Sequence, residues 1–392
     1  MTERLYYTDA NLVDFQAIVV AVEGDGKRVI LDRSAFYPTS GGQLFDIGTL
    51  GGVAIVDVID EDERVVHVCA EPVTFAIGEM VEGRVDRTRR FDHMQQHTAQ
   101  HLLSALLADE HGAPTVSVHF GDETNTLDVA TAEISAVKLV EIEQRANRLA
   151  AENRAVTVSF EDAATATGLR KPSDRGGELR IITIDGLDRS ACGGTHVART
   201  GEIGSILLRR TEKTKGNTRI EFVAGLRAVA RARADATLLS TAARALTASP
   251  EDVPALVDAQ LKRASDLERE RKRLAADVAR LEAGRMWSEA PVDANGLKRI
   301  RLAPLDGAVR DAEPLAQALV ALGSCVVLAV SPSTGGVMLG ASDGTGIDAG
   351  QTLRAALQSA GGRGGGSPRL AQGSVPDKLH LEAVAQSLGF TS

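Results

Sequence analysis

The fold is decided by two short segments that lie far apart in the chain: His97-Thr98-Ala99-Gln100-His101-Leu102-Leu103 and Cys192-Gly193-Gly194-Thr195-His196-Val197. Apolar periodicity predicts a helix over Phe91–Asp109, so the two histidines of the first segment emerge from one helix face with Cβ atoms about 6 Å apart. The two glycines of the second segment let the backbone turn tightly, so its cysteine and histidine converge on one point. We therefore expect the two segments to meet around a single ion.

Three imidazoles and one thiolate form a donor set that suits Zn²⁺. We predict one zinc ion per chain, bound by His97, His101, Cys192 and His196. His93 lies one helical turn before the first ligand, but the other four residues already complete a tetrahedron. Thr98 stands where zinc proteases carry a glutamate base, so hydrolysis here would need a metal-bound water, another residue or the substrate itself. A closed, purely structural zinc site is the alternative.

The composition is ordinary for a soluble globular chain of several domains. The 392 residues exceed a single ordinary core, and 43% of them are hydrophobic and 25% charged. A net charge of −9 argues against a protein that coats nucleic acid by bulk attraction, although it allows a local basic site. The three cysteines are widely separated, and neither a signal peptide nor a bilayer-spanning apolar stretch is present, so we expect a cytoplasmic protein without membrane contact.

The residue pattern predicts an α+β multidomain protein with four parts. Residues 1–88 are rich in β-branched segments and glycine turns, which favours a small β-barrel. Residues 89–228 mix helices and strands around the predicted zinc site and form a zinc-binding α+β domain. Residues 229–292 favour helix, and apolar residues at spacings of three, four and seven predict a helical linker or a coiled-coil hairpin, preferably a short antiparallel hairpin. Residues 293–392 form a small α/β domain.

The last part alternates strands and helices between turn residues. The expected elements are a strand near Leu297–Leu302, a helix near Glu313–Leu322, strands at Cys325–Val330 and Gly336–Ala341, and a helix at Asp348–Ala360. The run Gly361–Gly366 that follows is expected to be too flexible for a core element. It lacks the Gly-Lys-Ser/Thr pattern of a nucleotide-hydrolysing loop.

The two metal-binding segments resemble the editing domain of alanyl-tRNA synthetases and of the free-standing AlaX proteins. The stretch Phe36–Gly48, which contains Gly41-Gly42-Gln43, is similar to the glycine-rich motif of the β-domain that precedes this editing domain. Gly216–Glu221 looks like the family's closing strand, and Gly362–Gly373 resembles the C-terminal DHHA1 domain. The resemblance covers nearly the whole chain, and its motifs follow one another in the family's order. The chain is similar to the long form of the AlaX proteins.

The resemblance implies a zinc-dependent aminoacyl-tRNA deacylase, which hydrolyses the ester of tRNA(Ala) mischarged chiefly with serine and also with glycine. The four metal ligands carry over residue by residue. Because the β-domain begins within a few residues of Met1, we expect no aminoacylation domain and action in trans. No separate protein base is identified, so the attacking water is assigned to the zinc ion. Whether the ion polarises the carbonyl, holds water or binds the substrate's amino group stays open.

A site that rejects alanine must reward the extra hydroxyl of serine with a hydrogen bond. Thr115 and Ser117 lie on the strand expected after the metal-binding helix and alternate toward one face, so we expect Ser117, or else Thr115, to bind this hydroxyl. Their alternative is a solvated strand face. Gly41, Gly42 and Gln43 are expected near the acceptor end of the tRNA, and a Gly-Gly turn that closes a β-hairpin is an equally good interpretation.

The densest basic stretch near the metal-binding segments is expected to contact RNA phosphates, with a solvated hairpin as its alternative. It contains Arg209, Arg210, Lys213, Lys215 and Arg219. The helical or C-terminal region is expected to form a homodimer, or else to space the domains. Two rival functions stay open: a threonyl-type deacylase acting on Ser-tRNA(Thr), and a non-catalytic RNA-binding protein stabilised by zinc. The threonyl family usually has Cys-Arg-Gly-Pro-His at the second segment and lacks the DHHA1 tail, which disfavours the first rival.

Overall fold

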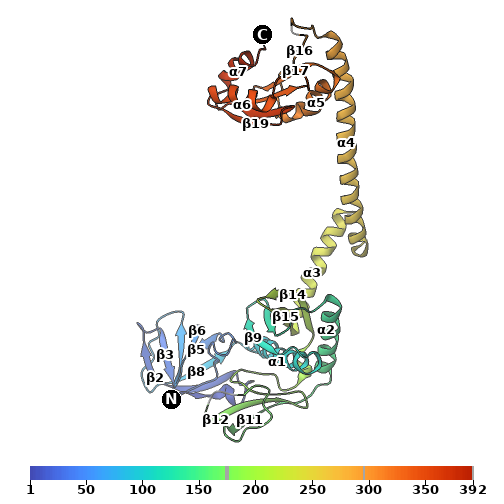
Figure 1. The fold of residues 1–392 in the computed structure, drawn as a ribbon. Helices are drawn as coiled ribbons and strands as arrows, with labels where there is room; N and C mark the ends of the chain where they lie inside the picture. Colours follow the sequence, from blue (N-terminus) through green and yellow to red (C-terminus); the bar gives the residue numbers. More distant parts are fainter. Residues whose placement is uncertain (173–175, 295, 391–392) are drawn as a thin grey trace. The chain divides into compact units, whose positions relative to one another are not determined.

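The computed structural model describes residues 1–172, 176–294 and 296–390, and the chain divides into two compact units, Met1–Ala242 and Ala243–Ser392. Both units combine helices with sheets (Figure 1), which confirms the predicted α+β multidomain class. The finer division into four parts stays a prediction. Within the described ranges, no helix is long and apolar enough to cross a bilayer.

The first unit begins with six strands that pair in a closed cycle, in the order β2-β3-β7-β6-β5-β8. In β2 (Asp14–Glu23) the residues Phe15, Ala17 and Val19 are buried and the residues between them are exposed, which is the alternation of a small filled barrel. The other strands are β3 (Arg28–Leu31), β5 (Gly48–Leu50), β6 (Val53–Glu61), β7 (Arg64–Cys69) and β8 (Met80–Val85). The short strands β1 (Glu3–Arg4) and β4 (Arg33–Ser34) pair in parallel.

Helix α1 (Arg87–His111) follows the barrel and carries the first metal-binding segment. It begins earlier than the apolar periodicity predicted, because the Asp86 side chain caps it by accepting a hydrogen bond from the Arg89 amide at 2.8 Å. Gly112, in the left-handed conformation with φ of 60°, ends it. Its buried leucine face consists of Leu102, Leu103, Leu106 and Leu107.

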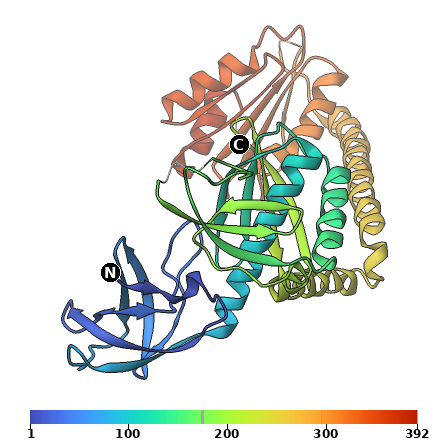
Figure 2. The same ribbon diagram turned by 90° about the horizontal axis from the view of Figure 1, so that it is seen from below.

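Helix α1 packs on a four-stranded antiparallel sheet in the order β14-β15-β10-β9, and α2 (Ala136–Ala151) completes the same apolar core (Figure 2). These strands are β9 (Thr115–Phe120), β10 (Asn125–Val129), β14 (Ile206–Thr214) and β15 (Asn217–Ala224). A second antiparallel sheet leads into the second metal-binding segment. It consists of β11 (Val156–Asp162), β12 (Glu178–Ile184) and β13 (Asp188–Ala191). The two segments therefore reach the site from a helix and from the end of a sheet.

The second unit contains a five-stranded sheet in the order β16-β17-β18-β20-β19. Strand β17 (Cys325–Ser331) is buried throughout: Val326 and Leu328 pack toward α6 and α7, while Val327 and Ala329 pack on the other side with α5. The remaining elements are β16 (Lys298–Arg301), β18 (Gly336–Ala341), β20 (Leu370–Ser374), α5 (Glu313–Leu322), α6 (Ala349–Ser359) and α7 (Leu381–Ser387). Each expected helix and strand of this part is present, with ends that agree within two residues.

The glycine run, which was expected to be too flexible for a core element, has regular structure at the edge of the sheet and not in its core. Its residues form strand β19 (Arg363–Gly366), which pairs antiparallel with β20 at the edge of the sheet. A Cβ atom on Gly364 would lie 2.5 Å from Leu357 Cδ1 and 2.8 Å from the Gln372 carbonyl oxygen. The glycines therefore let this strand press against α6 and its neighbouring strand, where a side chain would clash.

The helical stretch forms α3 (Gly225–Ala245) and α4 (Val253–Glu289), separated near Ser249–Pro250 as the sequence predicts. The apolar seam expected inside a packed hairpin is exposed in α4, with side-chain exposures from 42% to 78%. The seam consists of Val257, Leu261, Leu267, Leu274, Val278 and Leu281. Helical periodicity thus determines where these residues lie on α4, and the packed hairpin stays a prediction.

A buried ion pair ties α1 to the barrel segment that precedes β5. The Arg90 guanidinium contacts the Asp46 carboxylate at 2.5 Å, and the two side chains are 1% and 0% exposed. Arg90 also donates to the Ala10 carbonyl at 2.7 Å, while Asp46 accepts from the Tyr37 amide at 2.7 Å. Since all of these groups are paired, the charges are tolerated in the interior.

We predict that Arg90→Met destabilises the first unit by about 3–5 kcal/mol, because Asp46 is then left buried without a counter-charge. All three tyrosines lie in the first unit and the single tryptophan, Trp287, lies in the second. Urea unfolding followed by tyrosine near-ultraviolet dichroism should therefore shift, while the transition followed by Trp287 fluorescence stays in place. A double variant with Asp46→Asn should recover part of the loss. Unchanged tyrosine midpoints would contradict the prediction.

Candidate metal centre

The structure brings together the four residues that the sequence predicts as ligands. One ligand atom from each of His97, His101, Cys192 and His196 lies within 4.8 Å of all the others. The Cys192 Sγ atom lies 3.5 Å from His97 Nε2 and 3.4 Å from His196 Nε2. The three histidines are buried and Cys192 is half-buried. Such a cluster could hold a metal ion.

Each imidazole is oriented by a hydrogen bond at Nδ1, which leaves Nε2 directed at the shared centre. His97 Nδ1 lies 2.8 Å from Gln43 Oε1, and His101 Nδ1 lies 2.8 Å from Asp188 Oδ2. The Thr98 hydroxyl donates to the Met94 carbonyl at 2.7 Å, so it accepts from His196 Nδ1 at 3.3 Å. A hydrogen-bond acceptor behind every ligating histidine is the usual outer shell of a metal site.

Asp188 is the acidic member of this outer shell and is itself firmly held. Its carboxylate accepts from Arg170 Nε at 2.5 Å and from the Ser190 hydroxyl at 2.9 Å, and its side chain is 1% exposed. Burial alone would lower the pKa of His101, but the hydrogen bonds to Asp188 and Cys192 outweigh it and raise this pKa to about 10. The position between these two anionic groups therefore favours a positive charge, as a bound metal ion supplies.

The electrostatics also favour the thiolate form of the cysteine. Burial opposes ionisation, but His97 and His196 beside the sulfur lower the pKa of the Cys192 thiol well below its ordinary value. Burial, together with the neighbouring His97, lowers the pKa of His196 to about 3, so that this imidazole is neutral at pH 7. A thiolate and a neutral imidazole are the protonation states that ligate a metal.

The turn between Cys192 and His196 is shaped by one arginine and one glycine. Arg180 on β12 donates hydrogen bonds to the carbonyls of Cys192 and Gly194, at 2.7 and 2.9 Å. These two bonds hold the turn in place. A Cβ atom on Gly194 would lie 2.2 Å from His97 Cε1. Only glycine lets the His97 ring lie directly against this turn.

The glycine-rich barrel loop reaches the centre through its glutamine. Gly41 and Gly42, with φ of 56° and 88°, form the two-residue turn between Ser40 and Gln43, as the hairpin interpretation expected. Gln43 is 2% exposed; its amide oxygen accepts from His97 and from the Thr195 amide, and its nitrogen donates to the Thr195 hydroxyl at 2.9 Å. Gln43 thus positions a candidate ligand, His97, and contact of the three residues with tRNA stays a prediction.

Thr115 and Ser117 do not share a face of β9, so that prediction is wrong. The pairing of β9 with β10 shifts register at this end of the strand, which reverses the alternation. The Thr115 hydroxyl bonds Ser104 of α1 at 2.8 Å, whereas Ser117 is exposed and bonds Asp128 at 2.9 Å. Alternation along the strand places the side chains of Ser117 and Phe120 on opposite faces of β9. The Phe120 ring lies 5.1 Å from the ring of His97, so Ser117 points away from the side of His97. Their role in substrate binding remains untested.

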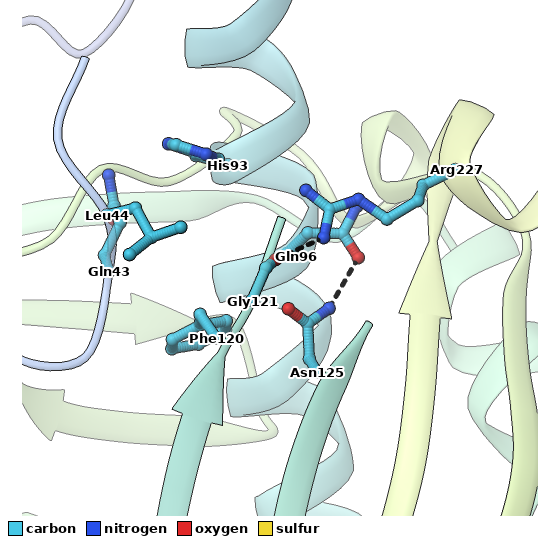
Figure 3. A pocket seen from close by; sticks show the side chains of 8 residues that line it. All are labelled: Gln43, Leu44, His93, Gln96, Phe120, Gly121, Asn125 and Arg227. Carbon is cyan, nitrogen blue, oxygen red and sulfur yellow. Dashed lines mark hydrogen bonds between the residues drawn. The ribbon is translucent and has the colours of Figure 1, made fainter. Parts of the chain in front are cut away.

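A small pocket lies beside Phe120 and Gln43 (Figure 3). Both residues also contact His97 of the candidate metal centre. Its lining consists of Gln43, Leu44, His93, Gln96, Phe120, Gly121, Asn125 and Arg227. His93 lies outside the four-residue cluster and lines this pocket, and burial lowers its pKa to about 4. From the sequence alone, only the helical position of His93 was predictable, since Asn125 and Arg227 come from separate elements.

The basic residues predicted to bind RNA lie on the β14–β15 hairpin, and four of them form ion pairs. Arg209 and Arg210 share Glu221, Lys213 pairs with Glu133, and Arg219 pairs with Asp128 at 2.7 Å. Lys215 is exposed at the tip of the turn. These contacts suit the solvated-hairpin interpretation, and phosphate binding here stays a prediction.

Comparison with known families agrees with this architecture. Residues 179–221, which include Cys192 and His196, match the family described as the threonyl and alanyl tRNA synthetase second additional domain. Residues 2–89, which include the barrel, match the family described as tRNA synthetases class II (A). The fold and site therefore define a protein related to aminoacyl-tRNA synthetases.

Individual relatives narrow this class. The chain is 32% identical over 406 residues to the alanine–tRNA ligase of Methanoregula boonei, covering 97% of this chain and 42% of that protein. The enzymes of Archaeoglobus fulgidus and Thermococcus kodakarensis are 33% and 31% identical, with 98% and 99% of this chain and 43% of each relative covered. The chain is thus homologous to alanyl-tRNA synthetases over most of its length. It spans less than half the length of these curated relatives.

The sequence offered no pattern that identifies Asp188 as the partner of His101, although an acidic residue four positions before Cys192 was visible. We predict that Asp188→Asn weakens metal binding by about 10- to 100-fold, because the amide orients His101 less well and removes a negative charge. Competition with a chromophoric chelator, with Zn²⁺ as the probe, measures this affinity. Asp185→Asn, an exposed acid on the same turn, is the matched control. Equal affinities for the two variants would rule out the orienting role.

Proposed function

We propose that this protein is a zinc-dependent deacylase that acts in trans on mischarged tRNA(Ala), chiefly Ser-tRNA(Ala) and also Gly-tRNA(Ala). The observation that carries the proposal is the oriented centre of three histidines and one cysteine. Half of it lies inside the segment that matches the threonyl and alanyl tRNA synthetase second additional domain. The neighbouring barrel loop completes the centre by holding His97 through Gln43. A site that offers metal ligands suits the hydrolysis of an ester.

Zinc fits the donor set. Zn–N bonds of about 2.0–2.1 Å and a Zn–S bond of about 2.3 Å place the donors of a tetrahedron about 3.3–3.6 Å apart. The two sulfur–nitrogen distances of 3.4 and 3.5 Å lie in this range. The neutral imidazole of His196 and the thiolate of Cys192 are the forms that zinc binds. We therefore assign one zinc ion to the site.

The residues around the centre divide the work of hydrolysis. When bound, zinc supplies a Lewis acid beside the ester. Asp188 and Gln43 hold His101 and His97 in place, and Arg180 fixes the turn that carries Cys192, so the centre needs little reorganisation. Cys192 is the half-buried ligand, which makes its side the approach for an ester from solvent. Thr98, in the place of a protease base, accepts from His196 and serves orientation.

The comparison with relatives supports tRNA(Ala), and not tRNA(Thr), as the tRNA in the proposed substrate. The family description for residues 179–221 names both threonyl and alanyl synthetases, but the relatives compared above are alanine–tRNA ligases matched over 97–99% of this chain. The match extends through the second unit. The exposed apolar seam on α4 supports a homodimer as a further part of the proposal. Lys215, exposed at the tip of the β14–β15 turn, supports an RNA contact there.

The test is release of labelled amino acid by the purified chain from pre-charged tRNA supplied without any synthetase. We expect rapid release from Ser-tRNA(Ala), slower release from Gly-tRNA(Ala), and buffer-rate release from Ala-tRNA(Ala) and Ser-tRNA(Thr). His97→Ala should lower the rate by more than about 100-fold, because a ligand and its ordered outer shell are lost. His119→Ala, an exposed histidine on β9, should retain the rate.

The alternatives give different results in this assay. Release from Ser-tRNA(Thr) alone would assign the threonyl-type activity instead. Release from none of the four tRNAs, with one zinc bound per chain, would leave a structural zinc in an RNA-binding protein. Activity that survives in His97→Ala would remove the metal centre from the mechanism.

A further inference from the structure

An exposed phenylalanine lies in one row with the candidate ligand Cys192 on the second antiparallel sheet of the first unit. Phe160 on β11 pairs directly with Arg180 on β12, and the Cys192 amide donates to the Arg180 carbonyl at 3.0 Å. Directly opposed residues of antiparallel strands point to the same sheet face, so Phe160 and Cys192 share a face. Since neighbouring strands lie about 4.7–4.9 Å apart, Phe160 stands roughly 10 Å from Cys192.

The Phe160 ring is open to solvent. It is 42% exposed, and β11 is the edge strand in the order β11-β12-β13. Val158, two residues earlier on the same face, is 40% exposed, whereas its cross-strand partner Ile182 is fully buried. The exposed apolar surface on this row is therefore confined to the edge strand. An aromatic ring exposed in this way offers its face to a flat partner.

Tyr7 lies beside Arg180, the middle residue of this row, and next to the turn that carries Cys192. Arg180 donates to the Tyr7 carbonyl at 2.9 Å, and its guanidinium carbon lies 5.3 Å from the centre of the Tyr7 ring. A Cβ atom on Gly193 would lie 3.6 Å from Tyr7 Oη. The Tyr7 side chain is half-buried, and its hydroxyl forms no hydrogen bond to a described residue. This hydroxyl can therefore donate to or accept from a ligand beside the candidate metal centre.

The next row on the same sheet face is acidic, which limits the kind of partner that Phe160 accepts. Asp162 and Glu178 pair across the strands and are both exposed. Two carboxylates repel a phosphate, whereas an uncharged flat ring can stack on the phenylalanine. The surface thus combines a hydroxyl close to the candidate centre with a stacking surface further along the row. That separation is of the order of one nucleoside.

We propose that Phe160 and Tyr7 bind the nucleoside whose ribose carries the ester. Its base stacks on Phe160, and its free ribose hydroxyl forms a hydrogen bond with the Tyr7 hydroxyl. The inference rests on the proposed deacylase function, which it deepens. The ester then lies on the side of Cys192, the half-buried member of the cluster. Phe160 contributes to binding alone, because it stands two strands away from the reacting atoms.

A binding measurement tests the stacking without any hydrolysis. The probe is uncharged tRNA(Ala) whose 3′-terminal adenine is replaced by 2-aminopurine, a base whose fluorescence responds to stacking. We expect a fluorescence change with the wild-type protein and none with Phe160→Leu, which keeps apolar bulk but removes the ring. Phe160→Trp should restore the change. Thr157→Ala, on the opposite face of the same strand, is the matched control and should behave like wild type.

Kinetics then test the role in hydrolysis. Phe160→Leu should raise KM about 10-fold at unchanged kcat, equally for Ser-tRNA(Ala) and Gly-tRNA(Ala), because both carry the same terminal nucleoside. Tyr7→Phe, which removes only the hydroxyl, should lower kcat/KM about 3- to 10-fold for both. Zinc content and the tyrosine dichroism signal of the Phe160 variants show loss of fold separately.

The failures of the two proposals give different results. A fluorescence change and a KM that are both unaltered in Phe160→Leu would overturn the nucleoside site, and so would equal losses in Phe160→Leu and Phe160→Trp. A wild-type protein that hydrolyses neither tRNA would overturn the deacylase function itself. The fluorescence of the uncharged probe would still report the nucleoside site in that case.

Discussion

The convergence of three imidazole Nε2 atoms and one thiolate is the constraint on which the first unit depends. A helix presents two of these donors and a tight turn after β13 presents the other two, so neither element can shift without dispersing the site. The turn can approach the helix only because Gly194 has no side chain against the His97 ring. Arg180 then donates hydrogen bonds to two carbonyls of the turn, those of Cys192 and Gly194, and so restrains the backbone of the glycine pair.

The barrel contributes to the site as well as to stability. Gln43 comes from a barrel loop and bridges His97 of the helix to Thr195 of the turn, so one side chain links three parts of the first unit. The Arg90–Asp46 pair ties the base of the same helix to the segment just after this loop. A centre assembled in this way is preorganised by hydrogen bonds, which is the property that electrostatic catalysis needs. The pocket beside Phe120 is lined by His93 and Gln96 of α1 and by Asn125 of β10.

The regular structure of the glycine run and the mistaken expectation about β9 share a physical origin. Glycine-rich sequence predicts flexibility when it is considered alone, but in β19 the absent side chains are what permits close packing against β20 and α6. Alternation along β9 predicts that Thr115 and Ser117 share a face, but a shift in pairing register reverses it. In both cases the partner strand decides the outcome, and a single strand's sequence does not specify its partner.

The sequence by itself determined the four candidate ligands, because His97 and His101 follow from helical spacing and Cys192 and His196 from a short turn, and both are local patterns. It also determined most elements, among them α5 and β18, whose apolar periodicities are strong. Only the tertiary structure decided which groups stand behind the ligands. Gln43 lies 54 residues from His97 in the chain, and Asp188 lies 87 residues from His101. Hydrogen bonds over such separations depend on how sheets and helices pack, and packing leaves no periodic trace in the sequence.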